Sequence, residues 1–270
     1  MSALTFTLKK DLAQRLDVAP LTPDALAEKS AKDIAATLLW YGKQQIRADE
    51  AFDIAGDDAN NIAFKNSNDK LDYIGSQMKS GSITIEGNAG NYLGFQMRNG
   101  DITLNGNASD FSASGMAKGT LTINGDVGDF LGGAIIGERK GMRGGLVIVK
   151  GNAGDRVGDQ MRRGIILIEG NVGRYCASSM LAGTIGVLGS VGEYIGFGMR
   201  RGTLLLTQTP ELHATIQDCG MHTLPFLSLM FKAFQDLPTR FAQIKQNRVQ
   251  RYVGDLGNDG KGEILVFNFN

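Results

Sequence analysis

The chain has 270 residues, and its 28 basic and 28 acidic side chains give a formal net charge of zero at pH 7. Nucleic acids and anionic membranes attract proteins through a basic excess, so this balance disfavours both as partners. Two cysteines, the lack of a signal-like apolar stretch near the N-terminus and the lack of a long apolar run predict a cytoplasmic protein without membrane spans. The 37 glycines, in a chain with 42% hydrophobic residues, point to a repeated backbone geometry rather than to disorder.

The first 50 residues are expected to form an N-terminal cap and partner-contact segment, because the end of a stacked sheet must be covered. Thr22 is a suitable N-cap and Pro23 suits a first helical turn, so a short helix is predicted there. A second short helix is expected over residues 31–39. Irregular first units of the next region are expected at residues 52–54 and 62–64.

The centre of the chain repeats a five-residue pattern in which apolar residues alternate before a glycine. The pattern is seen as Ile83-Thr84-Ile85-Glu86-Gly87 and returns every 19 residues, except for one step of 26. The seven extra residues, 135–141, are interpreted as an inserted loop that carries Glu138, Arg139 and Lys140. Columns of methionine and glycine keep the same spacing. The units begin at Ile83, Ile102, Leu121, Val147, Ile166 and Ile185.

This repeat predicts the fold class. A short strand cannot bury its apolar face alone, whereas equivalent strands stacked about 4.8 Å apart form a continuous apolar ladder. The methionine column is expected to point into the core, because methionine fills irregular gaps. Since parallel crossovers are usually right-handed, we predict an all-β fold, a right-handed parallel β-helix (solenoid) with coils of about 19 residues. It is expected to cover residues 51–207, between short N-terminal and C-terminal helical caps.

Residues 208–270 are expected to form a helical extension followed by a final strand. The apolar segment 224–234 has helical length but is too short to span a bilayer, so it should pack on the solenoid or against a partner. Residues 240–252 are predicted to continue as a basic helical segment. Residues 263–267 are predicted to be a last strand suited to edge pairing.

Few residues suggest catalytic or metal chemistry. His213, Cys219 and His222 have a spacing that matches no common zinc motif, so a polar turn is preferred to a metal site. Residues 255–260 resemble the start of a calcium loop, but Val266 stands where a bidentate glutamate is required, so a tight turn is preferred. No catalytic residue and no bound metal are therefore predicted for this chain.

Two columns of charged residues at the turns are the remaining candidates for binding. They are either solvated charges that keep the protein soluble, or a docking stripe for an acidic partner or a polyanionic ligand, in which arginine makes bidentate contacts. The basic column contains Lys79, Arg98, Lys118, Arg143, Arg162, Arg163, Arg200 and Arg201. The acidic column contains Asp110, Asp129, Asp155 and Glu193.

The unit Gly-Asn-Ala-Gly-x-x-x-Gly-x-x-Met-x-x-Gly, as in residues 87–100, resembles a repeat shared by two families. They are the C-terminal domain of glutamate synthase large subunits and the C subunit of formylmethanofuran dehydrogenase, and both imply right-handed β-helices. The flanking segment 21–34 and residues 52–56 resemble the N-terminus of the C subunit, and the glutaminase and flavin-binding regions of glutamate synthase are absent. Similarity to the bacterial branch, the C subunit of the formyltransferase/hydrolase complex of methylotrophs, lies in residues 218–227, 251–256 and 260–264.

The resemblance implies a non-catalytic structural subunit of an enzyme complex in one-carbon metabolism, specifically formaldehyde oxidation. There a formyl group passes from formyl-tetrahydromethanopterin to a methanofuran-type carrier and is hydrolysed to formate. The implied partners are an amidohydrolase-like subunit that holds the metal, a formyltransferase subunit and a further small subunit, with no cofactor bound by this chain. The acidic tail of the carrier is expected to contact Arg162, Arg163, Arg200 and Arg201.

Three alternatives stay open. The chain could be the C subunit of an archaeal-type formylmethanofuran dehydrogenase. It could be an independent acyltransferase on a hexapeptide-type solenoid, which is disfavoured because residues 50–207 contain no histidine. It could also be a stand-alone solenoid that binds a polyanion, which the zero net charge disfavours.

Overall fold

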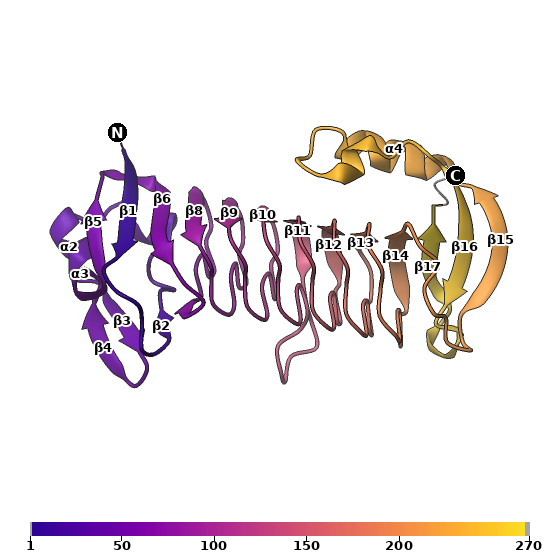
Figure 1. Cartoon of the computed structure of the whole chain (residues 1–270), viewed down its shortest axis with the longest axis horizontal. Coiled ribbons are helices and arrows are strands. Elements are labelled where there is room, and N and C mark those ends of the chain that lie inside the picture. The colour runs from indigo at the N-terminus through magenta and orange to yellow at the C-terminus, as the bar shows by residue number, and fades with distance from the viewer. Residues whose placement is uncertain (1, 268–270) are drawn as a thin grey trace.

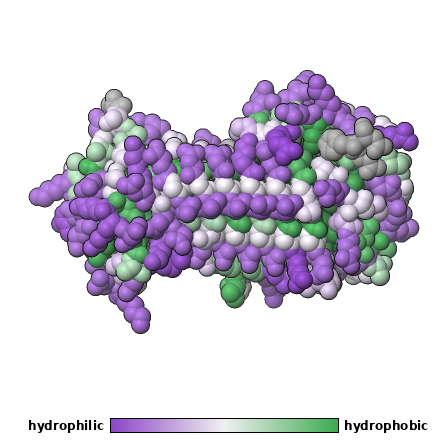
Figure 2. Space-filling model, in the orientation of Figure 1, coloured by the Kyte–Doolittle hydropathy of each residue, from purple (hydrophilic) through white to green (hydrophobic). Residues whose placement is uncertain are grey.

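The computed structural model describes residues 2–267 and is elongated, with the repeat region lying between two end structures (Figure 1). Each repeat contributes one strand, and its residues pair in parallel with the equivalent residues of the next repeat, such as Ile83 with Ile102 and Leu121 with Val147. Equivalent positions therefore lie side by side, and Figure 2 shows them as alternating purple and pale rows along the molecule. The repeat strands are β8 (Ser82–Gly87), β9 (Asp101–Asn105), β10 (Thr120–Ile123), β11 (Arg143–Val149), β12 (Arg163–Ile168), β13 (Thr184–Val187) and β14 (Arg201–Leu206).

The chain is mostly β-structure, as predicted, but its large 13-stranded sheet is mixed rather than purely parallel. At the N-terminal end, β1 (Ala3–Leu8) pairs in parallel with β6 (Asp58–Ser67) and antiparallel with β5 (Phe52–Ala55). Residues 52–54, expected as an irregular first unit, are thus part of an antiparallel edge strand. The reason is that β1 inserts between β5 and β6, where Phe6, Phe52 and Phe64 pack against one another.

The N-terminal helices agree with the sequence only in part. The first helix, α1 (Pro23–Leu26), follows Thr22 as predicted, although the Thr22 side chain makes no capping hydrogen bond. The second, α2 (Ala31–Ala35), ends four residues earlier than predicted, because Leu38 to Tyr41 pair as a hairpin strand instead. A third helix, α3 (Ala48–Ala51), precedes β5. A separate four-stranded sheet contains β2 (Leu16–Asp17), β3 (Leu38–Tyr41), β4 (Gln44–Arg47) and β7 (Leu71–Asp72).

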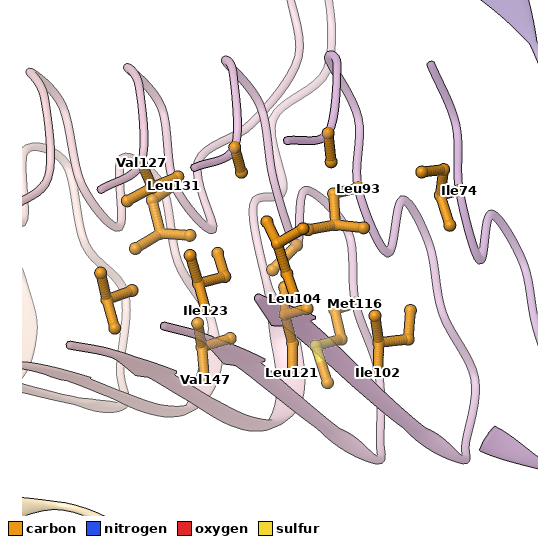
Figure 3. Packing of buried hydrophobic residues seen from close by; sticks show 14 of the residues in the cluster. Ile74, Leu93, Ile102, Leu104, Met116, Leu121, Ile123, Val127, Leu131 and Val147 are labelled. Atoms are coloured by element: carbon orange, nitrogen blue, oxygen red, sulfur yellow. The ribbon is translucent and has the colours of Figure 1, made fainter. Parts of the chain in front are cut away.

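The core follows the predicted alternation. In β8, Ile83 and Ile85 are buried while Thr84 between them is exposed. Figure 3 shows how the inward residues of successive repeats, such as Ile102 and Leu121, stack into one apolar ladder. The methionine column points inward as predicted, and none of its members is more than 1% exposed. These are Met78, Met97, Met116, Met142, Met161, Met180 and Met199.

The predicted inserted loop is confirmed. Residues 135–141 form no helix or strand and project from the repeat region next to β11 (Figure 1). The side chain of Ile136, within this loop, is 93% exposed. The loop therefore adds a projection at one position along a region that is otherwise regular.

Two predictions for the C-terminal part are wrong. Residues 240–252 are not helical, because only Arg240–Gln243 form a 3-10 helix (η1) and the following residues form a strand, β16 (Arg248–Gly254). The final strand, β17 (Lys261–Val266), is not at an edge, because it lies between β14, its parallel partner, and β16, its antiparallel partner. The edge is instead β15 (Gln217–Thr223), which pairs with β16.

The predicted apolar helix is confirmed as α4 (Pro225–Phe234). Its buried side chains, Leu227, Phe231 and Phe234, pack with Leu167 and Leu205, which face outward from the sheet. The helix therefore covers the outer face of the last repeats, and this cluster is separate from the core inside the repeats. Among residues 2–267, no helix is both long and apolar enough to cross a bilayer.

Candidate functional site

The residues of the acidic column form hydrogen bonds and an ion pair between successive repeats. The Oδ1 atom of Asp110 accepts a hydrogen bond from the backbone N–H of Asp129 at 2.8 Å. Asp129 and Asp155 accept in the same way from Asp155 and Arg174, each at 2.7 Å. The fourth member, Glu193, pairs with Arg174 at 3.3 Å. Because the turns leave backbone N–H groups that need partners, these carboxylates join successive repeats rather than stand free.

Two further ladders were not recognised in the sequence. Asn88 and Asn107 accept backbone hydrogen bonds from the next repeat, as do their equivalents in later units. An aromatic column also stacks, with ring centroids 4.6 Å apart for Tyr73 and Tyr92, and Arg156 takes the aromatic position after the inserted loop. The repeated Gly-Asn or Gly-Asp pairs and the regular spacing of tyrosine and phenylalanine were the available signals.

The basic column is divided by the inserted loop. Arg162 and Arg200 line one hollow of about 780 Å³, to which the loop contributes Arg139 and Glu138. Phe197, which is 53% exposed, adds an aromatic surface to the same hollow. Within residues 2–267, none of these three arginines forms an ion pair. The arrangement can hold an anionic group, because free guanidinium groups bind carboxylates in a bidentate manner.

The structure brings together only two of the four predicted arginines. Arg163 and Arg201 are exposed, but neither lines the hollow that Arg162 and Arg200 share. Each begins a strand, and they lie opposite Arg143 and Lys261 respectively in the sheet register. Neighbouring residues in an extended chain point in opposite directions, which separates each arginine from the one before it.

A buried carboxylate that the sequence suggested only as part of a calcium-type loop stands beside this hollow. Asp255 is 4% exposed and accepts hydrogen bonds from the backbone N–H groups of Gly198 at 3.0 Å and Gly257 at 2.9 Å. Burial would raise the pKa of Asp255, but hydrogen bonds from the Thr215 hydroxyl, from these two amides and from Asn258 lower the pKa overall. The hydrogen bond from Gly198 therefore attaches the predicted tight turn at residues 255–260 to the last repeat. Gly198 and Asn258 both line the hollow.

The residues considered as metal ligands have other contacts. The ring of His213 lies 3.2 Å from the carbonyl of Ile195 and 2.8 Å from the Thr215 hydroxyl. The ring of His222 lies 2.9 Å from the carbonyl of Cys219. In the part of the chain that the structure describes, no group of three or more histidine, cysteine or acidic side chains is arranged to hold a metal ion.

The chain is similar to known proteins, first of all in its repeat region. Residues 59–227 match the family model described as the GXGXG motif. The chain is 32% identical over 95 residues to the C subunit of a molybdenum-containing formylmethanofuran dehydrogenase 1 from Methanosarcina barkeri, covering 33% of this chain and 32% of the relative. It is 36% identical over 86 residues to the C subunit of the formyltransferase/hydrolase complex Fhc from Methylorubrum extorquens, covering 32% of each. These matched segments span about a third of the curated relatives.

Similarity to a solved structure extends much further. The X-ray crystal structure of the formyltransferase/hydrolase complex (FhcABCD) from Methylorubrum extorquens, in complex with methylofuran, contains a chain with a TM-score of 0.93 and 36% identity. The match covers 97% of this chain and 98% of that chain. The similarity therefore includes the two end structures as well as the repeats.

Proposed function

We propose a function for this chain from the premise that it belongs to the GXGXG family. The function is that of the C subunit, a non-catalytic structural subunit of a formyltransferase/hydrolase complex that converts formyl-tetrahydromethanopterin to formate through a methanofuran-type carrier. The observation that carries the proposal is the similarity over 97% of the chain, at 36% identity, to a chain of the FhcABCD complex. We place this complex in the cytoplasm.

Catalysis in this proposal belongs to the partners. An amidohydrolase-like subunit holds the metal and performs the hydrolysis, a formyltransferase subunit performs the transfer, and the complex also contains a further small subunit. Two pairs of exposed apolar residues support a role in assembly, because apolar residues that adjoin on a surface often mark a contact with another protein. One is on the hairpin, where Leu38 and Trp40 are 53% and 51% exposed; the other is on α4, where Phe226 and Leu229 are 42% and 73% exposed.

The proposal also includes details of the fold. We propose a right-handed parallel β-helix over residues 51–207, with an N-terminal cap over 1–50 and a C-terminal extension over 208–270. The parallel pairing of equivalent residues, 19 residues apart except for the step of 26 across the inserted loop, supports the β-helix. The handedness rests on the general preference of parallel crossovers.

We further propose that the hollow lined by Arg139, Arg162 and Arg200 holds the acidic tail of the carrier. Arg163 and Arg201 are then outer contacts, since they are exposed but do not line the hollow. Charge reversal by Arg162→Glu with Arg200→Glu should reduce the amount of carrier that purifies with the complex. The matched control is Arg163→Glu with Arg201→Glu, for which a smaller loss is expected. An unchanged carrier content in the first variant would exclude this contact.

The test of the whole proposal is native mass spectrometry of the chain purified from its own host through a mild affinity tag. Recovery with an amidohydrolase-like subunit and a formyltransferase subunit is expected. Recovery of a stable monomer alone would contradict the proposal and favour the stand-alone polyanion-binding protein. A second candidate is the C subunit of an archaeal-type formylmethanofuran dehydrogenase, which similarity to the C subunits of a molybdenum-containing and a tungsten-containing enzyme supports. Molybdenum or tungsten in the purified complex would identify this candidate.

A further inference from the structure

A second hollow, of about 370 Å³, lies on the other side of the inserted loop. Arg98 comes from one repeat, Ser114 and Gly115 from the next, and Arg143 from the start of β11. The loop adds Lys140 and Glu138, and Glu138 also lines the larger hollow described above. The seven inserted residues thus close one side of a concave surface over the turns of neighbouring repeats.

The charges in this hollow are not balanced. Arg98, Lys140 and Arg143 contribute three positive charges and Glu138 one negative charge, which leaves a net charge of +2. None of the three cations forms an ion pair with any described residue. Arg143 is held in place by the carbonyl of Gly115, which accepts from its Nε at 3.3 Å and from Nη2 at 3.2 Å. The cationic groups are therefore positioned without being neutralised.

One residue that lines this hollow, Ser114, has a buried hydroxyl without a partner. Ser114 is 1% exposed, and its Oγ atom is the buried side-chain polar atom in residues 2–267 that makes no hydrogen bond. Buried polar groups are nearly always paired, so such an atom calls for an explanation. At the equivalent position three repeats further on, the hydroxyl of Ser178 donates to the carboxylate of Asp159 in the preceding repeat. For Ser114 the equivalent residue in the preceding repeat is Phe95, which offers no carboxylate.

We propose that this hollow binds a small oxyanion of the phosphate type, either free or as the terminal group of a larger molecule. The Ser114 hydroxyl would donate to one oxygen of the anion, as Ser178 does to the carboxylate of Asp159. Arg98, Lys140 and Arg143 would supply charged donors from the remaining sides. A doubly charged anion matches the net charge of +2, whereas a monocarboxylate would leave it half balanced. This inference does not depend on the proposed function, because neither the carrier nor a partner subunit enters it.

The test is equilibrium dialysis of inorganic phosphate against the full chain, in the assembly in which it is purified, at ionic strength fixed with chloride. One saturable site per chain is expected. Arg98→Gln and Lys140→Gln should each weaken binding by about tenfold or more, the effect of losing a charged hydrogen bond. Ser114→Ala should weaken it by about tenfold, while keeping its thermal unfolding midpoint, because no existing hydrogen bond is removed. Arg162→Gln, in the neighbouring hollow, is the control and should change binding by less than about twofold.

Several results would overturn the inference. One is the absence of saturable binding. Another is that Arg162→Gln weakens phosphate binding as much as Arg98→Gln does. A third is unchanged phosphate binding by folded Ser114→Ala and Lys140→Gln variants. Phenyl phosphate distinguishes the source of the ligand. Binding as tight as that of inorganic phosphate supports a phosphate group on a larger molecule, and binding of inorganic phosphate alone supports a free ion.

Discussion

The outer face of the large sheet differs between its two halves, although the inner face is the same throughout. In the first three repeats the outward residue at the centre of each strand is Thr84, Thr103 or Thr122, and none of them is buried. In β11, β12 and β14 the equivalent residues are Ile148, Leu167 and Leu205, all at most 1% exposed. The second half is covered by α4 and η1, and the first is not. The inward residues are thus apolar in every repeat, whereas the polarity of the outward residues depends on whether that part of the sheet is covered.

The exception in the covered half supports this interpretation. Gly186 occupies the outward position of β13, and a Cβ atom built there would lie 2.6 Å from the ring of Phe241. Phe241 is fully buried and belongs to η1. A missing side chain on the sheet is therefore filled by an aromatic ring from the covering segment, so the two surfaces are complementary in shape.

The largest expected effect comes from placing a charge in each half. Leu167→Asp should destabilise the protein by about 4 kcal/mol or more, because an unpaired carboxylate would be buried beneath α4. Thr103→Asp, at the equivalent uncovered position, should cost about 1 kcal/mol or less. Urea unfolding of both variants measures the difference. Equal destabilisation would mean that α4 does not cover Leu167 in solution.

A smaller effect is expected from filling the space at Gly186. Gly186→Leu should destabilise the protein by about 2 kcal/mol, because the new side chain would displace the ring of Phe241. The displaced segment should be cleaved more rapidly by trypsin at Arg240, which lies in η1. Thr122→Leu is the matched control on the uncovered half and should not change the rate of cleavage there. An unchanged rate in Gly186→Leu would contradict the packing of η1 on β13.

These differences also explain how much could be predicted from the sequence. The repeat strands, the inserted loop and the buried methionines follow from the spacing between successive units, and the structure contains them. The positions of β1 and β17 could not be predicted in the same way, because each strand inserts beside one that is distant in the sequence. The alternation of Leu4, Phe6 and Leu8 was a signal for β1, but it does not name the pairing partner.

The candidate site shows the same limit. Stacking of the basic column predicted that Arg162 and Arg200 would lie on one side, and they share a hollow. Arg163 and Arg201 do not share it, because each occupies the next position of an extended chain and points elsewhere. The contribution of Arg139 depends on how the inserted loop folds back, which no repeat in the sequence specifies.

The contact between the covering segment and the sheet should depend on pH. Glu169 accepts a hydrogen bond from the backbone N–H of Arg240 at 2.9 Å and pairs with Lys150 at 3.1 Å. Burial would raise the pKa of Glu169, but the hydrogen bonds from Arg240, Thr239 and Lys150 lower it below its usual value. A carboxyl whose folded pKa is lowered stabilises the fold above its unfolded pKa, and this stabilisation is lost as the pH falls through the folded pKa.

Residues 239–243 should therefore loosen in acid before the repeat region does. The measurement is hydrogen exchange at the Arg240 amide between pH 7 and pH 3, corrected for the intrinsic rate, with the amide of Thr103 as the reference in the uncovered half. In Glu169→Gln the amide should be less protected at pH 7, by about 1 kcal/mol, and its protection should no longer depend on pH. The same pH dependence in Glu169→Gln and the unmodified protein would assign it to another group.

The smallest expected effect is a difference in reactivity between the two cysteine thiols, one in the core and one on the edge strand. Cys176 is fully buried among the inward residues of the repeats, and burial raises the pKa of its thiol to about 12. Cys219 lies on the edge strand β15 and is partly exposed. Because the thiolate is the reactive form, a thiol reagent at pH 8 should modify Cys219 and leave Cys176 unmodified until the protein unfolds. Cys219→Ser should abolish the labelling of the folded protein, whereas labelling of Cys176 at a similar rate would mean that the repeats open where the structure shows a closed core.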